Sequence, residues 1–162
     1  SLPHGVPSDK KVESGEFVLM DFGATYDGWH SDMTRTVCVG KPSDKMKFVY
    51  ETVLTAQLAA LDAVKAGMSG KALDKIARDI ITEAGYGDNF GQSLGHGVGV
   101  EIHESPYSSP SREDILPENS IVTVEPGIYL EGKFGVRIED FVVVTENGCI
   151  NMTKASKELI CL

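Results

Sequence analysis

The chain has 162 residues, of which 41% are hydrophobic and 24% charged, and its formal net charge is −9. This length is that of one domain, and the composition is that of an ordinary soluble globular protein. The acidic balance argues against nucleic acid and anionic membranes as partners, because both attract basic surfaces. No apolar run reaches the roughly 18 residues that a membrane-spanning helix needs.

The cysteines are Cys38, Cys149 and Cys161, an odd number with no CxxC pair. This pattern favours free thiols in a reducing compartment, which we take to be the cytoplasm. It gives no indication of a zinc finger. The first residues show no apolar segment of the kind found in a signal peptide.

The first predicted elements are two strands joined by a turn. Residues 16–22, EFVLMDF, form an apolar run bounded by glycines, which is typical of a buried strand. Asp27-Gly28 is a strong turn signal. Residues 31–40, SDMTRTVCVG, are rich in the threonine and valine that strands favour. We therefore expect an antiparallel hairpin.

Two helices are predicted next. Ser43 can cap the first, which we expect to end at Gly67, and Ser69 can cap the second, which we expect to end at Gly85. Apolar residues recur at helical spacing in both segments. The predicted stripes are Met46, Val49, Val53, Leu54, Leu58, Leu61 and Val64 in the first helix, and Leu73, Ile76, Ala77, Ile80 and Ile81 in the second.

The rest of the chain is mostly strand-like. Residues 86–106 are glycine-rich, and we expect them to be irregular. Residues 119–130 and 135–148 read as strands with connections, and 149–153 as a short final strand. The order of elements predicts an α+β domain, in which two helices cover a mostly antiparallel sheet.

Several acids and histidines lie where the pattern otherwise indicates buried strand or close-packed glycine. They are Asp21, Asp32, His96, His103, Glu125 and Glu139. A buried, unpaired carboxylate costs several kcal/mol, so each one needs a cation or hydrogen bonds. Arg78 falls on a predicted helix and Arg112 in a polar loop, which leaves only Arg35 and Arg137 for four carboxylates. Divalent cations are the other compensation.

Four carboxylates and one imidazole, without a thiolate, would form a hard, oxygen-rich donor set. Such a set suits Mn²⁺, Co²⁺ or Fe²⁺ better than a structural zinc. Four carboxylates suit two ions about 3.5–4 Å apart better than one ion. Each residue also has an ordinary structural interpretation, such as a strand-end cap for Asp21 or a turn residue for Glu125. Spacing alone leaves both interpretations open.

Five segments together resemble one known family. DFGATYDGWHSDMTRT, residues 21–36, resembles the D-x-G-x(8)-D-x-T-R-T signature of the pita-bread metallopeptidases, peptidase family M24. GHGVGVEIHESP, VEPGIYL and GVRIED resemble the remaining blocks, in the expected order. LPHGVPSD, near the start, looks like the Xaa-Pro branch of prolidases and aminopeptidases P. The resemblance covers essentially the whole chain and implies the pita-bread fold, a curved and mostly antiparallel sheet covered by helices.

The resemblance also implies a set of metal ligands. These are Asp21, Asp32, His96, Glu125 and Glu139. In the family, the first aspartate chelates one ion, the histidine and the VEPG glutamate bind the other, and the remaining two carboxylates bridge both. We expect Mn²⁺ at both positions, with Co²⁺, Fe²⁺ and Zn²⁺ as alternatives.

Further roles follow from the same matches. Glu125 matches the general base and proton shuttle, and His4 and His103 match two histidines that contact substrate and steady the transition state. Arg137 matches an arginine that orients a ligand carboxylate or meets a substrate carboxylate. Gln92 is a departure, because many Xaa-Pro relatives carry a histidine there, four residues before the ligand histidine. Glutamine can hydrogen-bond but cannot carry a proton charge.

The implied activity is hydrolysis of the bond before proline in a peptide substrate, by a metal-bridging hydroxide with Glu125 as general base. Aminopeptidase and dipeptidase activity are both open, as is a homo-oligomer of the full-length protein. Two other interpretations remain. One is a creatinase-like hydrolase, and the other is a non-catalytic binding module on the same fold.

Catalytic domains of the family are longer than this chain and usually follow an N-terminal domain. We therefore expect residues 1–162 to be a single, N-terminally incomplete catalytic domain from the C-terminal part of a longer protein. We expect the isolated fragment to be inactive or poorly stable, because removed elements would leave apolar surface exposed.

Overall fold

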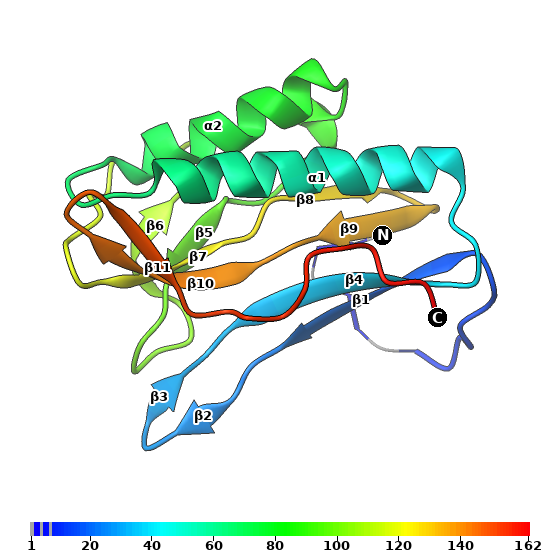
Figure 1. Ribbon diagram of the computed structural model, residues 1–162, viewed down its shortest axis with the longest axis horizontal. Coiled ribbons are helices and arrows are strands. Elements are labelled where there is room, and N and C mark those ends of the chain that lie inside the picture. Colours follow the sequence, from blue (N-terminus) through cyan, green and yellow to red (C-terminus); the bar gives the residue numbers. More distant parts are fainter. Residues whose placement is uncertain (1, 4, 7) are drawn as a thin grey trace.

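The computed structural model describes residues 2–3, 5–6 and 8–162. Two helices lie side by side along one face of a curved arrangement of strands (Figure 1). Neither helix in this described part of the chain is long and apolar enough to cross a membrane. The predicted α+β class with mainly antiparallel pairing is confirmed.

The predicted hairpin is present. Strand β1 (Glu16–Phe22) pairs with β4 (Met33–Val39) in antiparallel register, with Asp21 opposite Thr34. Between them the chain continues as a short ribbon, β2 (Thr25–Tyr26) and β3 (Trp29–His30).

The turn of this ribbon lies at Asp27-Gly28, as predicted. Both residues have positive φ, 49° and 80°, as a type I′ turn requires. The expectation that β1 is buried is wrong, since Met20, Asp21 and Phe22 are exposed. Within the described residues β1 pairs only with β4, so one of its edges has no neighbouring strand.

The helices begin where predicted. In α1 (Asp44–Ala63) the Ser43 side chain accepts a hydrogen bond from the Met46 amide, and in α2 (Gly70–Glu83) Ser69 caps Ala72 in the same way. Helix α1 ends before Gly67 because the following amides bond elsewhere. Ala66 donates to the Thr145 carbonyl, and Gly67 to that of Leu116.

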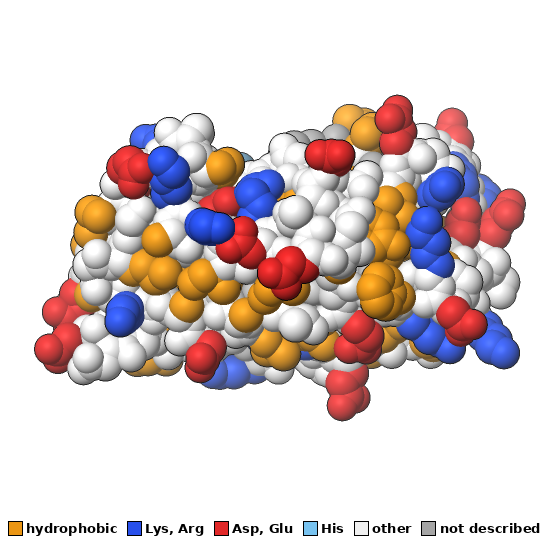
Figure 2. All heavy atoms as spheres, turned by 90° about the horizontal axis from the view of Figure 1, so that it is seen from above, with side chains coloured by type: hydrophobic (Ala, Val, Ile, Leu, Met, Phe, Trp, Pro, Cys, Tyr) orange, Lys and Arg blue, Asp and Glu red, His pale blue; other side chains and the backbone are white. Residues whose placement is uncertain are grey.

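The outer face of the helices carries apolar side chains between charged ones (Figure 2). Leu58, predicted to face the core, is instead among the exposed apolar residues, together with Phe48 of the same helix. Helix α1 therefore buries a narrower stripe than its sequence predicts.

The second half of the chain forms a five-stranded sheet with the order β11-β10-β7-β5-β6, and a separate hairpin. The sheet strands are β5 (Gly95–Gly97), β6 (Glu104–Ser108), β7 (Ile121–Val124), β10 (Asp140–Thr145) and β11 (Gly148–Asn151). The hairpin is β8 (Gly127–Leu130) with β9 (Phe134–Arg137), and a 3₁₀ turn, η1, covers Gly87–Asn89.

The expectation that residues 86–106 are irregular is therefore wrong for β5 and the start of β6. Strand β5 consists of glycines around His96, and strand propensity does not identify it. Its glycines serve close approach: a Cβ on Gly95 would lie 2.1 Å from the Thr123 carbonyl oxygen of β7. Absence of a side chain thus lets β5 enter the sheet.

The core lies between the helices and the strands. It is a continuous cluster of buried apolar side chains from both helices, from strands β7, β8, β9 and β10, and from the segments beside them: Val49, Tyr50, Val53, Ala56, Ala60, Val64, Leu73, Ala77, Ile81, Phe90, Leu94, Leu116, Val122, Val124, Ile128, Leu130, Val136, Ile138, Val142 and Val144. Both predicted helix stripes contribute to it.

A buried polar network joins the β1–β4 hairpin to the large sheet. Glu139 and Thr34 form an isolated bridge, in which the Glu139 amide donates to the Thr34 carbonyl at 3.1 Å. Next to it, Asp140 is fully buried and pairs with Arg35 at 2.7 Å and with Lys157 at 2.6 Å. Asn151 also donates to the Asp140 carboxylate. This network fixes the position of the β1–β4 hairpin relative to Glu139.

Replacing Asp140 by asparagine should destabilise the protein by about 3–5 kcal/mol, because Arg35 and Lys157 would lose their buried counter-charge. Asp79→Asn is the matched control, since Asp79 pairs with Lys75 on the exposed face of α2, and should cost less than about 0.5 kcal/mol. Urea unfolding of both variants at neutral pH measures the difference. Equal midpoints would contradict the structural role of Asp140.

Candidate metal centre

Three overlapping groups of potential ligands lie at one place in the fold. They are Asp21, Asp32 and Glu139; His96, Glu125 and Glu139; and Asp32, His96 and His103. Within each group one ligand atom per residue lies within 4.8 Å of the others. All five residues predicted as metal ligands are therefore brought together, and His103 lies with them.

Different elements deliver these side chains. Asp21 is near the end of β1, and Asp32 precedes β4 on the other arm of the same hairpin. His96 is the centre of β5, Glu125 follows β7, and Glu139 lies between β9 and β10. The site is thus a junction at which the hairpin meets the large sheet.

The site has a buried side and an open side. Glu139, His96 and Asp32 are buried, with 2%, 7% and 8% of their surface exposed, and Glu125 is half-buried. His103 is exposed, and the Asp21 side chain keeps 48% of its surface. The expectation that Asp21 is buried is therefore wrong, because β1 ends at an open edge of the fold.

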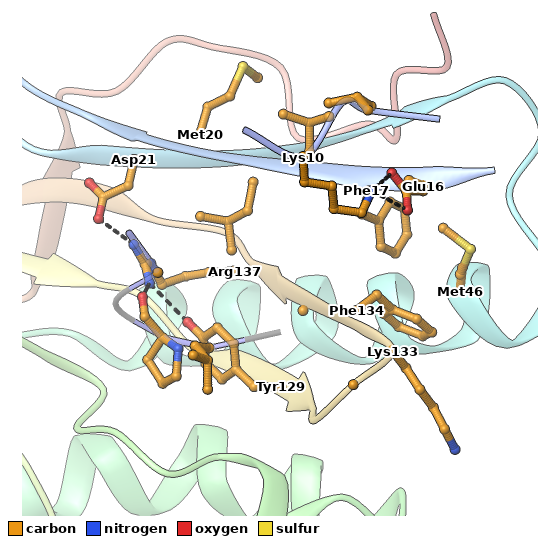
Figure 3. Close-up of a pocket in the computed structure, with 18 of the residues that line it drawn as sticks. Lys10, Glu16, Phe17, Met20, Asp21, Met46, Tyr129, Lys133, Phe134 and Arg137 are labelled. Atoms are coloured by element: carbon orange, nitrogen blue, oxygen red, sulfur yellow. Dashed lines mark hydrogen bonds and ion pairs between the residues drawn. The ribbon is translucent and has the colours of Figure 1, made fainter. Parts of the chain in front are cut away.

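Arg137 neutralises the charge of Asp21 from the buried side of the site. Figure 3 shows the guanidinium between the Asp21 carboxylate, with which it forms an ion pair, and the Tyr129 hydroxyl. It also donates to the Thr34 hydroxyl and the Pro3 carbonyl, each at 3.0 Å. The side chain is only 2% exposed. Burial opposes its charged form, but Tyr129, Glu125 and Asp21 outweigh burial and raise the pKa of Arg137.

Beyond Asp21 runs a groove of about 1130 Å³, lined on one side by β1 and on the other by the β8–β9 hairpin. Phe17 and Phe134, both labelled in Figure 3, line it and pack edge to face, with ring centroids 5.5 Å apart. The Asp21–Arg137 pair stands at one end of this groove. The open side of the site is thus continuous with an accessible surface.

Asp32 and Glu139 lack comparable compensation. Burial, and then the nearby Asp21 charge, raise the pKa of Asp32 to about 6. Burial, Glu125 and Asp32 raise the pKa of Glu139 well above its ordinary value, although Thr34 donates a 2.6 Å hydrogen bond to it. Burial alone would lower the pKa of His96. Its contacts with Glu125 and Asp32 raise that pKa by more than burial lowers it, so the net shift is upward.

These observations fit divalent cations. The donor atoms are carboxylate oxygens and one imidazole nitrogen, within distances that one coordination shell allows. Within the described residues, Arg137 is the only lysine or arginine that forms an ion pair with any of the four carboxylates, and it reaches only Asp21 and Glu125. Proton uptake by Asp32 and Glu139 is the alternative to a bound cation, and burial together with the neighbouring carboxylates raises the pKa of both groups.

His96 is oriented for ligation. Its Nδ1 lies 2.9 Å from the Gly97 carbonyl, which fixes the proton on Nδ1 in the neutral ring. Its Nε2 faces the carboxylates, 3.1 Å from Glu125 and 3.8 Å from Asp32. The His103 ring stands edge-on to that of His96, with centroids 4.4 Å apart. His4, predicted to contact substrate, lies outside the described residues.

Sequence reasoning missed several residues that hold the candidate ligands in place. Thr123 donates to Glu125 Oε1 at 3.0 Å, and Thr34 lies between Arg137 and Glu139. On α2, Arg78 pairs with buried Asp74 and donates to the carbonyls of Phe90 and Gln92. Their only sequence signal is polarity within an apolar pattern, which is equally typical of a helix surface.

The Asp32 shift predicts a pH dependence of stability in the metal-free protein. A carboxyl group whose pKa is raised by folding stabilises the fold while protonated, and this contribution disappears as the pH rises through about 6. The amide introduced by Asp32→Asn does not titrate. Between pH 4.5 and 7, with EDTA present, the unfolding free energy of wild type should fall relative to this variant by about 1–3 kcal/mol. The unfolding free energy of Asp79→Asn should change with pH in the same way as that of wild type. If the unfolding free energy of Asp32→Asn did so as well, the prediction would be contradicted.

Comparison with known proteins adds independent information. The family model for Metallopeptidase family M24 matches residues 1–146. An Xaa-Pro dipeptidase of Pyrococcus furiosus is 54% identical over 160 residues, which are 99% of this chain and 46% of that relative. The chain spans about half the length of the curated relatives it matches.

Solved structures agree with this. An Xaa-Pro dipeptidase from Bacillus anthracis superposes with a TM-score of 0.97 at 53% identity, covering 99% of this chain and 45% of that one. An X-Pro aminopeptidase from Thermotoga maritima superposes with a TM-score of 0.96 at 53% identity, again covering 99% of this chain and 45% of that one. The expected pita-bread fold is confirmed by this likeness.

Proposed function

We propose that this chain, which belongs to metallopeptidase family M24, carries the metal centre of a peptidase that cleaves the bond before proline. The observation that carries the proposal is the convergence of Asp21, Asp32, His96, Glu125 and Glu139 from five separate positions in the chain. Two similar proteins are named Xaa-Pro dipeptidase and one X-Pro aminopeptidase. We infer that residues 1–162 form one catalytic unit within a longer protein.

Membership of the family implies divalent metal ions. We propose that the five converging residues would hold two of them, and Asp32 and Glu139 are the two carboxylates that each belong to two of the three groups. The oxygen-rich donor set favours Mn²⁺ over a structural zinc. Bound ions would supply an activated water and a Lewis acid for the substrate carbonyl.

Glu125 is the group that we assign to proton transfer. Its half-buried carboxylate faces His96 with one oxygen, which also accepts the Thr123 hydrogen bond. The other oxygen accepts a 3.3 Å bond from Gln92. Held in this way, Glu125 can take a proton from water and deliver it to the proline nitrogen. That nitrogen belongs to a tertiary amide and must gain a proton before it leaves.

The remaining roles follow from position. Arg137 is buried against the Asp21 carboxylate, which supports orientation of a ligand carboxylate rather than contact with a substrate carboxylate. We assign to His103, which lies on the open side beside His96, the donation of a hydrogen bond to the oxyanion that develops on the carbonyl. The role of His4, the cytoplasmic location and the homo-oligomer stay predictions.

The test is hydrolysis by the full-length protein with added Mn²⁺. An Xaa-Pro dipeptide and an Xaa-Pro-Xaa tripeptide should be compared with peptides in which alanine replaces proline. We expect cleavage of at least one proline peptide, abolished by EDTA and restored by Mn²⁺. Cleavage of the dipeptide alone identifies a dipeptidase, and cleavage of the tripeptide an aminopeptidase. A folded, metal-loaded protein that cleaves none of them would favour the binding module or the creatinase-like hydrolase.

Glu125→Gln should lower kcat by at least about 10³-fold, because the amide keeps the hydrogen-bonding shape but cannot accept the proton. The circular dichroism spectrum and urea midpoint should stay close to wild type. Glu118→Gln, an exposed change of the same chemistry, is the control and should keep full activity. Near-full activity of Glu125→Gln would show that another group is the base.

A further inference from the structure

Gln92 occupies a central place beside the site. Its side-chain amide lies between Glu125 and Tyr129, in the loop that leads from η1 to β5. Nε2 lies 3.0 Å from the Glu125 carbonyl and 3.3 Å from its Oε2. Oε1 lies 3.0 Å from the Tyr129 hydroxyl. The amide therefore touches both the backbone and the carboxylate of Glu125.

Donor and acceptor counting fixes the direction of this amide. Arg137 can only donate, so the Tyr129 hydroxyl oxygen must accept its 2.9 Å bond. Burial raises the pKa of Tyr129 to about 12, so the hydroxyl keeps its proton. That proton can then go to Gln92 Oε1, which leaves Nε2 facing Glu125. The hydrogen bonds run one way, from Arg137 through Tyr129 and Gln92 to Glu125.

The backbone of Gln92 is held as firmly as its side chain. Its carbonyl accepts a 2.8 Å bond from Arg78, whose guanidinium is paired with Asp74. Asp74 is 1% exposed and also accepts the Leu94 amide. Two residues after Leu94 comes His96. Helix α2 thus fixes the loop that presents both Gln92 and a ligand.

Tyr129 is held in place by packing as well. Gly127 lies beneath its ring, where an added Cβ would be only 2.7 Å from the Tyr129 hydroxyl oxygen. Any larger residue at 127 would displace the hydroxyl from Gln92. The two partners of the Gln92 amide are therefore both set by their surroundings.

We propose that Gln92 is a positioning residue for Glu125, and that Tyr129 sets the direction in which the Gln92 amide donates. The inference rests on the proposed function of Glu125. Gln92 holds Oε2 while Thr123 holds Oε1, so that the carboxylate plane is fixed between His96 and Arg137. Orientation of a base acts on turnover more than on substrate binding.

The test uses Gln92→Leu, Tyr129→Phe and the double variant in the full-length protein with Mn²⁺. Gln92→Leu, which keeps the size but not the donor, should lower kcat about 10–100-fold with KM changed less than about twofold. Tyr129→Phe should lower kcat less, because the Gln92 amide remains, although it can then rotate so that Oε1 instead of Nε2 faces Glu125. The double variant should be no slower than Gln92→Leu alone, since the two residues act in one chain.

A readout besides activity is Mn²⁺ binding by titration calorimetry. Because Glu125 is also assigned as a ligand, Gln92→Leu should weaken the more weakly bound ion about tenfold. Gln92→His, which restores a donor, should recover part of both losses. Tyr86→Phe, a half-buried tyrosine that packs on Phe48, is the control and should match wild type.

The outcomes separate the two proposals. Wild type that neither binds Mn²⁺ nor cleaves proline peptides would overturn the proposed function. If wild type is active and Gln92→Leu stays within twofold of it in kcat and in Mn²⁺ affinity, the positioning role alone is overturned. Fully additive losses of kcat in the double variant would also overturn it. If Gln92→Leu lowers the urea midpoint, Gln92→Asn, whose amide is too short to reach Glu125, replaces it with the same expected losses.

Discussion

The repulsion among four carboxylates gathered within a few ångströms is the constraint to which the rest of the structure responds. In a partly buried site such charges interact strongly, and each either finds a cation or takes up a proton. Arg137 meets this need for Asp21, but Asp32 and Glu139 are left with raised pKa values. The fold thus holds these carboxylates close together against their mutual electrostatic repulsion.

What resists that repulsion is the set of polar contacts behind the site. The Arg35–Asp140 pair joins β4 to β10 one residue away from Glu139, and the Asp74–Arg78 pair ties α2 to the loop before His96. Both aspartates are buried and fully engaged in hydrogen bonds. These pairs are costly to desolvate, yet they fix geometry in a way that apolar packing does not. These pairs therefore hold the backbone on either side of the site against the repulsion among the carboxylates.

Part of this structure could be predicted from the sequence, and the reason for the rest is physical. Strong periodicity and serine caps located both helices, and Asp27-Gly28 located the hairpin turn. Residues such as Asp32 and Glu139 were identified by resemblance to family blocks, since their spacing alone was ambiguous. Strand β5 was missed because glycine there serves close contact, which no propensity reports. The links from Gln92 to Tyr129 and from Thr34 to Arg137 join distant segments, and one sequence does not show which distant polar residues meet.

The unequal burial of the candidate ligands gives the site a buried side and an open side. Glu139, Asp32 and His96 form a floor from which water is largely excluded, so charges there interact through a low local dielectric. Asp21 and His103 lie at the open side and are accessible to solvent. Glu125 lies between the two, half-buried, with its carboxylate held by Thr123 and Gln92. This intermediate position suits the proton transfer that we propose for Glu125, because full burial would isolate the carboxylate from water and full exposure would leave it unoriented.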